Sequence, residues 1–136
     1  MTVNMSTSEY KYVPATHAKL RRCIKYLQNL YQLRDWEIKL DTSYKLPSDF
    51  AGDAPDEYNA LANISADRLR ATIWCPLKRH KEENENPYEA LTHEMTHVLT
   101  ERCGNKPEDE LLVRIISPSI YRLMCADMGI TLGDLK

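Results

Sequence analysis

The sequence predicts an α+β fold built as a single domain. Apolar residues recur at helical spacing in three long stretches, at residues 15–33, at residues 87–103 and from residue 107 to near residue 128. Short segments typical of β-strands lie between the first two stretches. The 136 residues are enough to bury a hydrophobic core without stabilising cross-links. We expect a loose N-terminal segment at residues 1–12 and one domain at residues 13–136.

The first predicted helix, at residues 15–33, forms the scaffold. Its apolar residues recur at three- and four-residue steps and define one buried stripe, while lysines and arginines occupy the outer face. A strand follows at residues 36–41, where apolar and charged residues alternate. The stripe of the helix consists of Leu20, Cys23, Ile24, Leu27, Leu30 and Tyr31.

A hairpin is predicted after a Pro- and Gly-containing loop at residues 42–58. Its strands cover residues 60–65 and 70–75, joined around residues 66–68. The second strand ends at a proline and leads into a charged segment at residues 78–85, which we expect to be a loop. Together with the first strand, the hairpin predicts a small, mainly antiparallel sheet.

The helix predicted at residues 87–103 carries the sequence HEMTH. His93 and His97 are four residues apart, so they stack on one face of a helix. Neutral imidazole nitrogens bind Zn²⁺ at about 2.0–2.1 Å, and one helical turn holds two of them in register. Glu94 lies roughly 100° round the helix, where a carboxylate can reach a metal-bound water without being a ligand. The motif predicts one zinc ion on His93 and His97, with Glu94 as the general base.

Capping signals frame this helix. Asn86 is the expected N-cap, Pro87 occupies the first helical position, Glu89 stands at the capping-box position and Gly104 is the expected stop. The alternative is a surface helix with two solvated histidines. The remaining positions are mostly apolar, however, and such a helix would bury a His-His-Glu cluster at a cost unless a metal or partners satisfied it.

A third zinc ligand is expected from the last helix, which begins at Pro107. At 100° per residue, Asp109 falls on its predicted buried face, Glu108 lies at the margin and Glu110 points well away. Asp109 is therefore the predicted third ligand. Glu101, one turn after His97, and the two flanking glutamates remain alternatives. The predicted buried face consists of Leu112, Val113, Ile116, Ile120 and Leu123.

Composition excludes several classes of protein. A net charge of −2 argues against an electrostatic nucleic-acid binder, and we interpret the short basic runs at residues 21–22 and 78–81 as solvated faces. No apolar run is long enough to span a membrane, and the first residues lack the features of a signal peptide. Four scattered cysteines without a C-x-x-C pair indicate reduced thiols, so we expect a cytoplasmic protein.

These segments together resemble the small zincin-like metallopeptidases, many of which bacteriophages and prophages encode. The resemblance is carried by DWEI at residues 35–38, ATIWCP at residues 71–76, HEMTH at residues 93–97 and EDELLVRII at residues 108–116. More distantly, the chain is similar to the ImmA/IrrE and SprT-like groups. No third histidine follows the motif, which argues against a strict SprT-type site. In the ImmA-like pattern a ligand glutamate opens the second helix, and Asp109 fits that register with Asp in place of Glu.

The resemblance implies a zinc-dependent metallopeptidase of minimal zincin-like architecture, in which Glu94 serves as general base and acid. The expected partner is a peptide or protein substrate, received along the hairpin at residues 64–75 if that edge accepts an added strand. For a phage-encoded protein, the location would be the cytoplasm of the bacterial host. The alternative is a non-catalytic phage regulatory or host-interaction protein that zinc stabilises.

Overall fold

The computed structural model of the chain describes residues 8–48, 50, 59–104 and 110–136. Within these residues it contains helices and a small three-stranded sheet, so the predicted α+β class is confirmed. The predicted helices and strands that fall on these residues are present, with ends close to the predicted ones. The elements are α1 (His17–Leu30), β1 (Glu37–Asp41), β2 (Leu61–Ser65), the 3₁₀ turn η2 (Ala66–Arg68), β3 (Arg70–Trp74), α2 (Leu77–Glu83), α3 (Pro87–Arg102) and α4 (Glu110–Met128).

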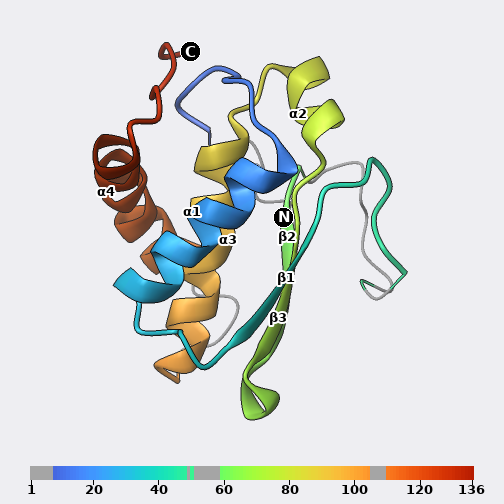
Figure 1. The fold of residues 1–136 in the computed structure, drawn as a ribbon, viewed down its shortest axis with the longest axis vertical. Helices are drawn as coiled ribbons and strands as arrows, with labels where there is room; N and C mark the ends of the chain where they lie inside the picture. Colours follow the sequence, from blue (N-terminus) through green and yellow to red (C-terminus); the bar gives the residue numbers. More distant parts are fainter. Residues whose placement is uncertain (1–7, 49, 51–58, 105–109) are drawn as a thin grey trace.

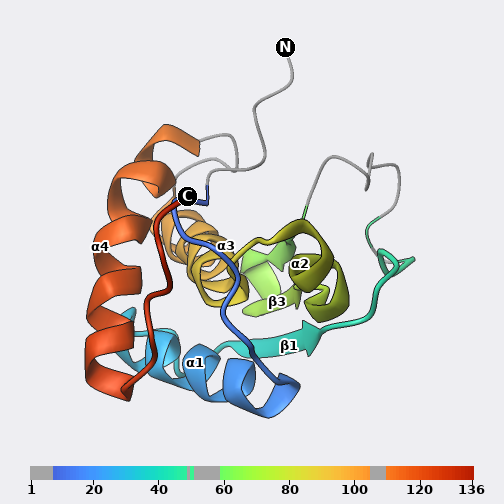
Figure 2. The ribbon, with the colours of Figure 1, turned by 90° about the horizontal axis from the view of Figure 1, so that it is seen from above.

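The central helix of the fold is α3. Figure 1 shows α1 crossing in front of α3, with the sheet on one side of this pair and α4 on the other. Seen from above, α3 lies between the sheet and α4 (Figure 2), and it contacts α1, α4, β2 and β3. Leu91, Met95 and Val98 of α3 are fully buried in the core that these elements share. No helix in the described part of the chain is long and apolar enough to cross a bilayer.

The sheet has the order β1-β3-β2 and is mixed. The predicted hairpin is antiparallel, with Leu61 opposite Trp74, but β1 pairs with β3 in parallel, with Glu37 opposite Arg70. This parallel pair departs from the mainly antiparallel sheet that we expected. The long connection after β1 carries the chain to the far edge of the sheet, so β3 returns between its neighbours and runs in the direction of β1.

Helix α2 occupies most of the segment that we predicted to be a charged loop, and this prediction was wrong. Pro76 precedes the helix, and Asn84 ends it in the left-handed conformation with φ of 55°. His80 is fully buried, and its Nδ1 lies 2.9 Å from the carbonyl oxygen of Pro76. The Arg79 guanidinium lies 5.6 Å from the centre of the Trp74 ring. The basic run therefore packs partly inward instead of forming only a solvated face.

Asn86 caps α3 as predicted and also ties three segments together. Its Oδ1 accepts hydrogen bonds from the backbone N–H groups of the second and third residues of α3, each at 3.0 Å. Its Nδ2 donates to the carbonyl oxygens of Lys11 and Leu132 and to the hydroxyl of Tyr121. Asn86 is fully buried, so these bonds replace all of its contact with water. The start of α3 is thereby fixed to both terminal segments and to α4.

Glu89 does not close a capping box. Its carboxylate accepts hydrogen bonds from the Ser8 hydroxyl and from the backbone N–H groups of Glu9 and Tyr10. Tyr10 is buried and pairs with Leu135 in an isolated β-bridge. Within the segment predicted to be loose, residues 8–12 are therefore hydrogen-bonded to the body, and residues 1–7 lie outside the described residues.

Replacing Asn86 with Ala is expected to lower the free energy of unfolding by about 2–4 kcal/mol, because the cap is lost and buried partners are left unsatisfied. Denaturant unfolding measures the change. Thr16→Ala is the matched control, since Thr16 caps α1 by accepting one exposed hydrogen bond from the backbone N–H of Lys19. The control should cost only about 1 kcal/mol. Equal losses in both variants would contradict the role of Asn86 as a link between segments.

Candidate metal centre

Helix α3 places His93 and His97 side by side. Their ring centroids are 5.1 Å apart and their planes meet at 71°. Both side chains are nearly buried, with 15% and 14% of their surface exposed. Thr92 and Thr96, which each precede one of the histidines, are fully buried, and each hydroxyl donates to the carbonyl oxygen one turn earlier. The spacing that the sequence predicted thus leaves both imidazoles facing the same space.

Glu110, the first residue of α4, completes a group of three donors. Its Oε2 lies 2.9 Å from His93 Nε2, and its Oε1 lies 3.0 Å from His97 Nε2. One ligand atom from each residue lies within 4.8 Å of the others. Donors at zinc distances on a tetrahedron are about 3.3 Å apart, so the observed separations are close to those of a zinc site. Two imidazoles and a carboxylate are also a donor set that zinc uses.

The expectation that Glu110 points away from the site was wrong. The fully buried face of α4 runs through Val113, Tyr121 and Met124, with the nearly buried Ser117 between them. This face is turned by one residue relative to the predicted one, which began at Leu112. Glu110 is three residues before Val113 and therefore lies on the same face of the helix.

The other candidate ligands are placed differently. Asp109, the predicted third ligand, and Glu108 lie outside the described residues. Glu101 is half-buried on α3. Within the described residues it is not part of the group that His93, His97 and Glu110 form.

Electrostatic coupling within the cluster is strong. Burial alone would raise the pKa of Glu110, but hydrogen bonds from both histidines hold it far below its usual range. Burial lowers the pKa of His97, yet the hydrogen bond to Glu110 and the nearby carboxylates outweigh this effect and raise it. A metal ion binds the deprotonated nitrogen of an imidazole and so competes with protons for it. Metal affinity should therefore weaken as the pH falls.

Glu94 lies beside the cluster without belonging to it. Its side chain is on α3 and only 9% of the residue is exposed. Burial raises its pKa, the charges of His93 and His97 lower it, and the charge of Glu110 raises it, with a net increase. A carboxylate whose pKa is raised by burial is a stronger base than one in water, and Glu94 lies next to the candidate metal site.

Arg114 is a site residue that the sequence analysis missed. Its Nε lies 3.2 Å from Glu110 Oε2, the same oxygen that faces His93. The two residues are one helical turn apart, so the spacing in the sequence was the available signal. The contact holds the Glu110 carboxylate from the side of α4, while the histidines hold it from the side of α3.

Removing Arg114 is expected to weaken zinc binding roughly 10–100-fold, as with other residues that orient a metal ligand through a hydrogen bond. The test is a competition titration of Arg114→Ala against a chromophoric chelator. Arg122→Ala, on an exposed position of the same helix, is the matched control and should bind zinc as the native protein does. Tighter zinc binding in Arg114→Ala would mean that charge repulsion outweighs the orientation of Glu110.

Comparison of the chain with models of known protein families, with curated proteins and with solved structures finds no match. The observations that bear on function are therefore the geometry of His93, His97 and Glu110 and the position of Glu94.

Proposed function

We propose that this protein is a zinc-dependent peptidase. One observation carries the proposal: His93 and His97 direct their Nε2 atoms at the Glu110 carboxylate, and Glu94 follows the first histidine on the same helix. The resemblance of the HEMTH segment to zincin-like metallopeptidases points to the same activity. His93, His97 and Glu110 would hold the ion, leaving a fourth position open for water or substrate.

Zinc, when bound, would polarise a peptide carbonyl and lower the pKa of water near it. Glu94 would accept a proton as the water oxygen attacks the carbonyl carbon. It would then deliver that proton to the departing nitrogen as the C–N bond breaks. Burial raises the pKa of Glu94, which makes its carboxylate a stronger base for the first step. The products are a carboxylic acid and an amine.

Strand β2 is the best-placed element to receive an extended substrate. In the part of the chain that the structure describes, β3 lies between β1 and β2, so β2 is an outer strand of the sheet. Of the groove predicted at residues 64–75, only residues 64 and 65 belong to this outer strand, which spans Leu61–Ser65. Since β2 also contacts α3, a peptide added there would run beside the helix that carries His93 and Glu94.

The proposal includes a cytoplasmic location, which the free thiols support. Cys23, Cys75 and Cys125 are buried and Cys103 is exposed, and all are unpaired. Burial raises the pKa of the Cys23 thiol to about 12, which makes this buried thiol unreactive. Unpaired cysteines of this kind are typical of proteins from reducing compartments.

Incubation of the zinc-loaded protein with a diverse peptide mixture tests the proposal, with cleavage products identified by mass spectrometry. New N-termini should appear with zinc and should be absent after chelation and in a His93→Ala variant. Metal content of each sample, measured by elemental analysis, should be close to one zinc per native chain and near zero for the variant. Absence of zinc from the native protein after reconstitution would overturn the proposal.

A further inference from the structure

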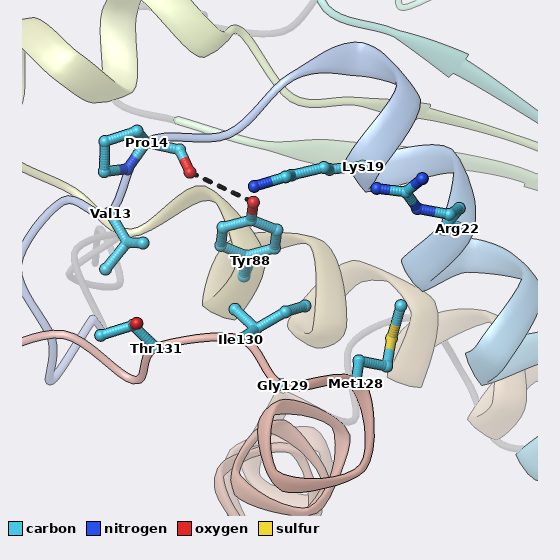
Figure 3. Close-up of a pocket in the computed structure, with 9 residues that line it drawn as sticks. All are labelled: Val13, Pro14, Lys19, Arg22, Tyr88, Met128, Gly129, Ile130 and Thr131. Atoms are coloured by element: carbon cyan, nitrogen blue, oxygen red, sulfur yellow. Dashed lines mark hydrogen bonds between the residues drawn. The ribbon is translucent and has the colours of Figure 1, made fainter.

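A cavity lies apart from the metal cluster, where the N-terminal segment, α1, the start of α3 and the end of α4 meet (Figure 3). Its volume is about 200 Å³. None of the residues that line it belongs to the cluster of His93, His97 and Glu110. The proposed peptidase reaction therefore makes no use of this cavity.

Two positively charged side chains, Lys19 and Arg22, line one side of the cavity. Lys19 and Arg22 are three residues apart on α1, so their side chains share one face of the helix. Figure 3 shows both head groups on the same side, with the Lys19 amine directed toward the Tyr88 hydroxyl. Neither cation forms an ion pair with an acidic residue in the described part of the chain.

The surrounding groups do not neutralise these charges. Burial raises the pKa of Tyr88 to about 12, so its hydroxyl is neutral and donates to the carbonyl oxygen of Pro14 at 3.1 Å. The end of α4 contributes the negative end of a helix dipole, which is worth roughly half a unit charge. Part of that end is already satisfied, because Ile130 N–H donates to the Cys125 carbonyl oxygen. A net positive charge remains at the cavity.

The rest of the wall is mixed, with polar groups such as the hydroxyls of Tyr88 and Thr131 beside apolar side chains. Val13, Met128 and Ile130 are half-buried and face the cavity from two segments that are far apart in the sequence. Water in such a space would gain few hydrogen bonds from these side chains. The site thus combines two cations with three apolar side chains, which is the complement of a small anion that carries a hydrocarbon group.

We propose that this cavity binds a small carboxylate with a short apolar chain. The carboxylate would accept hydrogen bonds from Lys19 and Arg22, the latter through the fork of its guanidinium group. The chain would lie against Val13, Met128 and Ile130. The volume corresponds to about seven water molecules and is below the range of about 300–1,000 Å³ typical of drug-sized ligands, so the ligand has few heavy atoms.

Titration of the ¹⁵N-labelled full chain with hexanoate tests the proposal. Saturable shifts are expected at the backbone amides of Tyr88, Ile130 and Thr131. Hexanol lacks the charge and acetate lacks the chain, so each should bind at least about tenfold more weakly, a difference of about 1.4 kcal/mol. This comparison uses only the native protein and does not depend on the folding of a variant.

A charge-removing variant provides the second test. Lys19→Gln combined with Arg22→Gln should weaken hexanoate binding at least about tenfold, because charge-assisted hydrogen bonds are lost. Lys25→Gln, an exposed position on α1 that does not line the cavity, is the matched control and should leave binding unchanged. Equal affinity for hexanol and hexanoate, shifts confined to other residues, equal weakening in the control, or no saturation at millimolar hexanoate would each overturn the proposal.

Discussion

Replacing Glu94 with Gln is expected to abolish peptide hydrolysis while leaving zinc bound. Glutamine has nearly the shape of glutamate but cannot accept the proton of the attacking water. A general base contributes about 10²–10⁴-fold to the rate, and the loss should be of that size or larger. Glu94 is outside the group formed by His93, His97 and Glu110, so zinc content should stay at the native level. Cleavage rate and metal content, measured on the same sample, check both halves of the prediction.

Glu101→Gln is the matched control for this experiment. Glu101 is half-buried on the same helix, and the charge of His97 acts on its carboxyl group, yet it is not part of the donor group in the described residues. The control should keep most of the activity and all of the zinc. Full activity in Glu94→Gln would contradict a catalytic role for this carboxylate. Zinc binding without any activity in the native protein would instead favour the non-catalytic, zinc-stabilised interaction protein.

Loss of the Glu110 carboxylate is expected to reduce zinc affinity by more than about 100-fold. Removing a residue that only orients a metal ligand costs roughly 10–100-fold, and Glu110 would be a ligand itself. The Glu110→Ala variant keeps both histidines but offers the ion one protein ligand fewer. Since Glu110 accepts hydrogen bonds from both Nε2 atoms, its removal also frees the rings to turn. A competition titration with a chromophoric chelator gives the affinity, and circular dichroism shows whether the helices persist.

Asp109→Ala is the comparison that distinguishes the two acidic candidates of this segment. The proposal for Glu110 expects Asp109→Ala to retain zinc close to the native affinity, and the same holds for Glu108→Ala. Zinc retained in Glu110→Ala but lost in Asp109→Ala would return the role of third ligand to Asp109. Retention in all three variants would leave the two histidines as the main source of affinity.

The features that the sequence predicted best depend on residues close together in the chain. Asn86 caps α3 because its side chain reaches backbone N–H groups two and three residues later. His93 and His97 share a face because one helical turn separates them. Such relations follow from the geometry of a helix, and distant segments do not alter them.

The rotation of α4 could not be read from its sequence. This helix has apolar residues on several faces, including Leu111 and Ile115, which are 72% and 65% exposed. The buried face, by contrast, includes the polar side chains of Ser117 and Tyr121. Packing against α3 decides which face is buried, and a difference of one residue moves Glu110 to the site. The faces of α4 differ too little in hydrophobicity for the sequence pattern to show which of them is buried.

The sequence by itself determined the α+β class, the Asn86 N-cap of α3 and the pair of imidazoles with Glu94 beside them, because each depends on spacing along a single element. Tertiary structure alone decided the parallel pairing of β1, the inward packing of Arg79 and His80 on α2, and the meeting of Glu110 with the histidines. These features join segments that are remote in the chain. Their relative positions follow from how complete surfaces pack together, which local patterns do not encode.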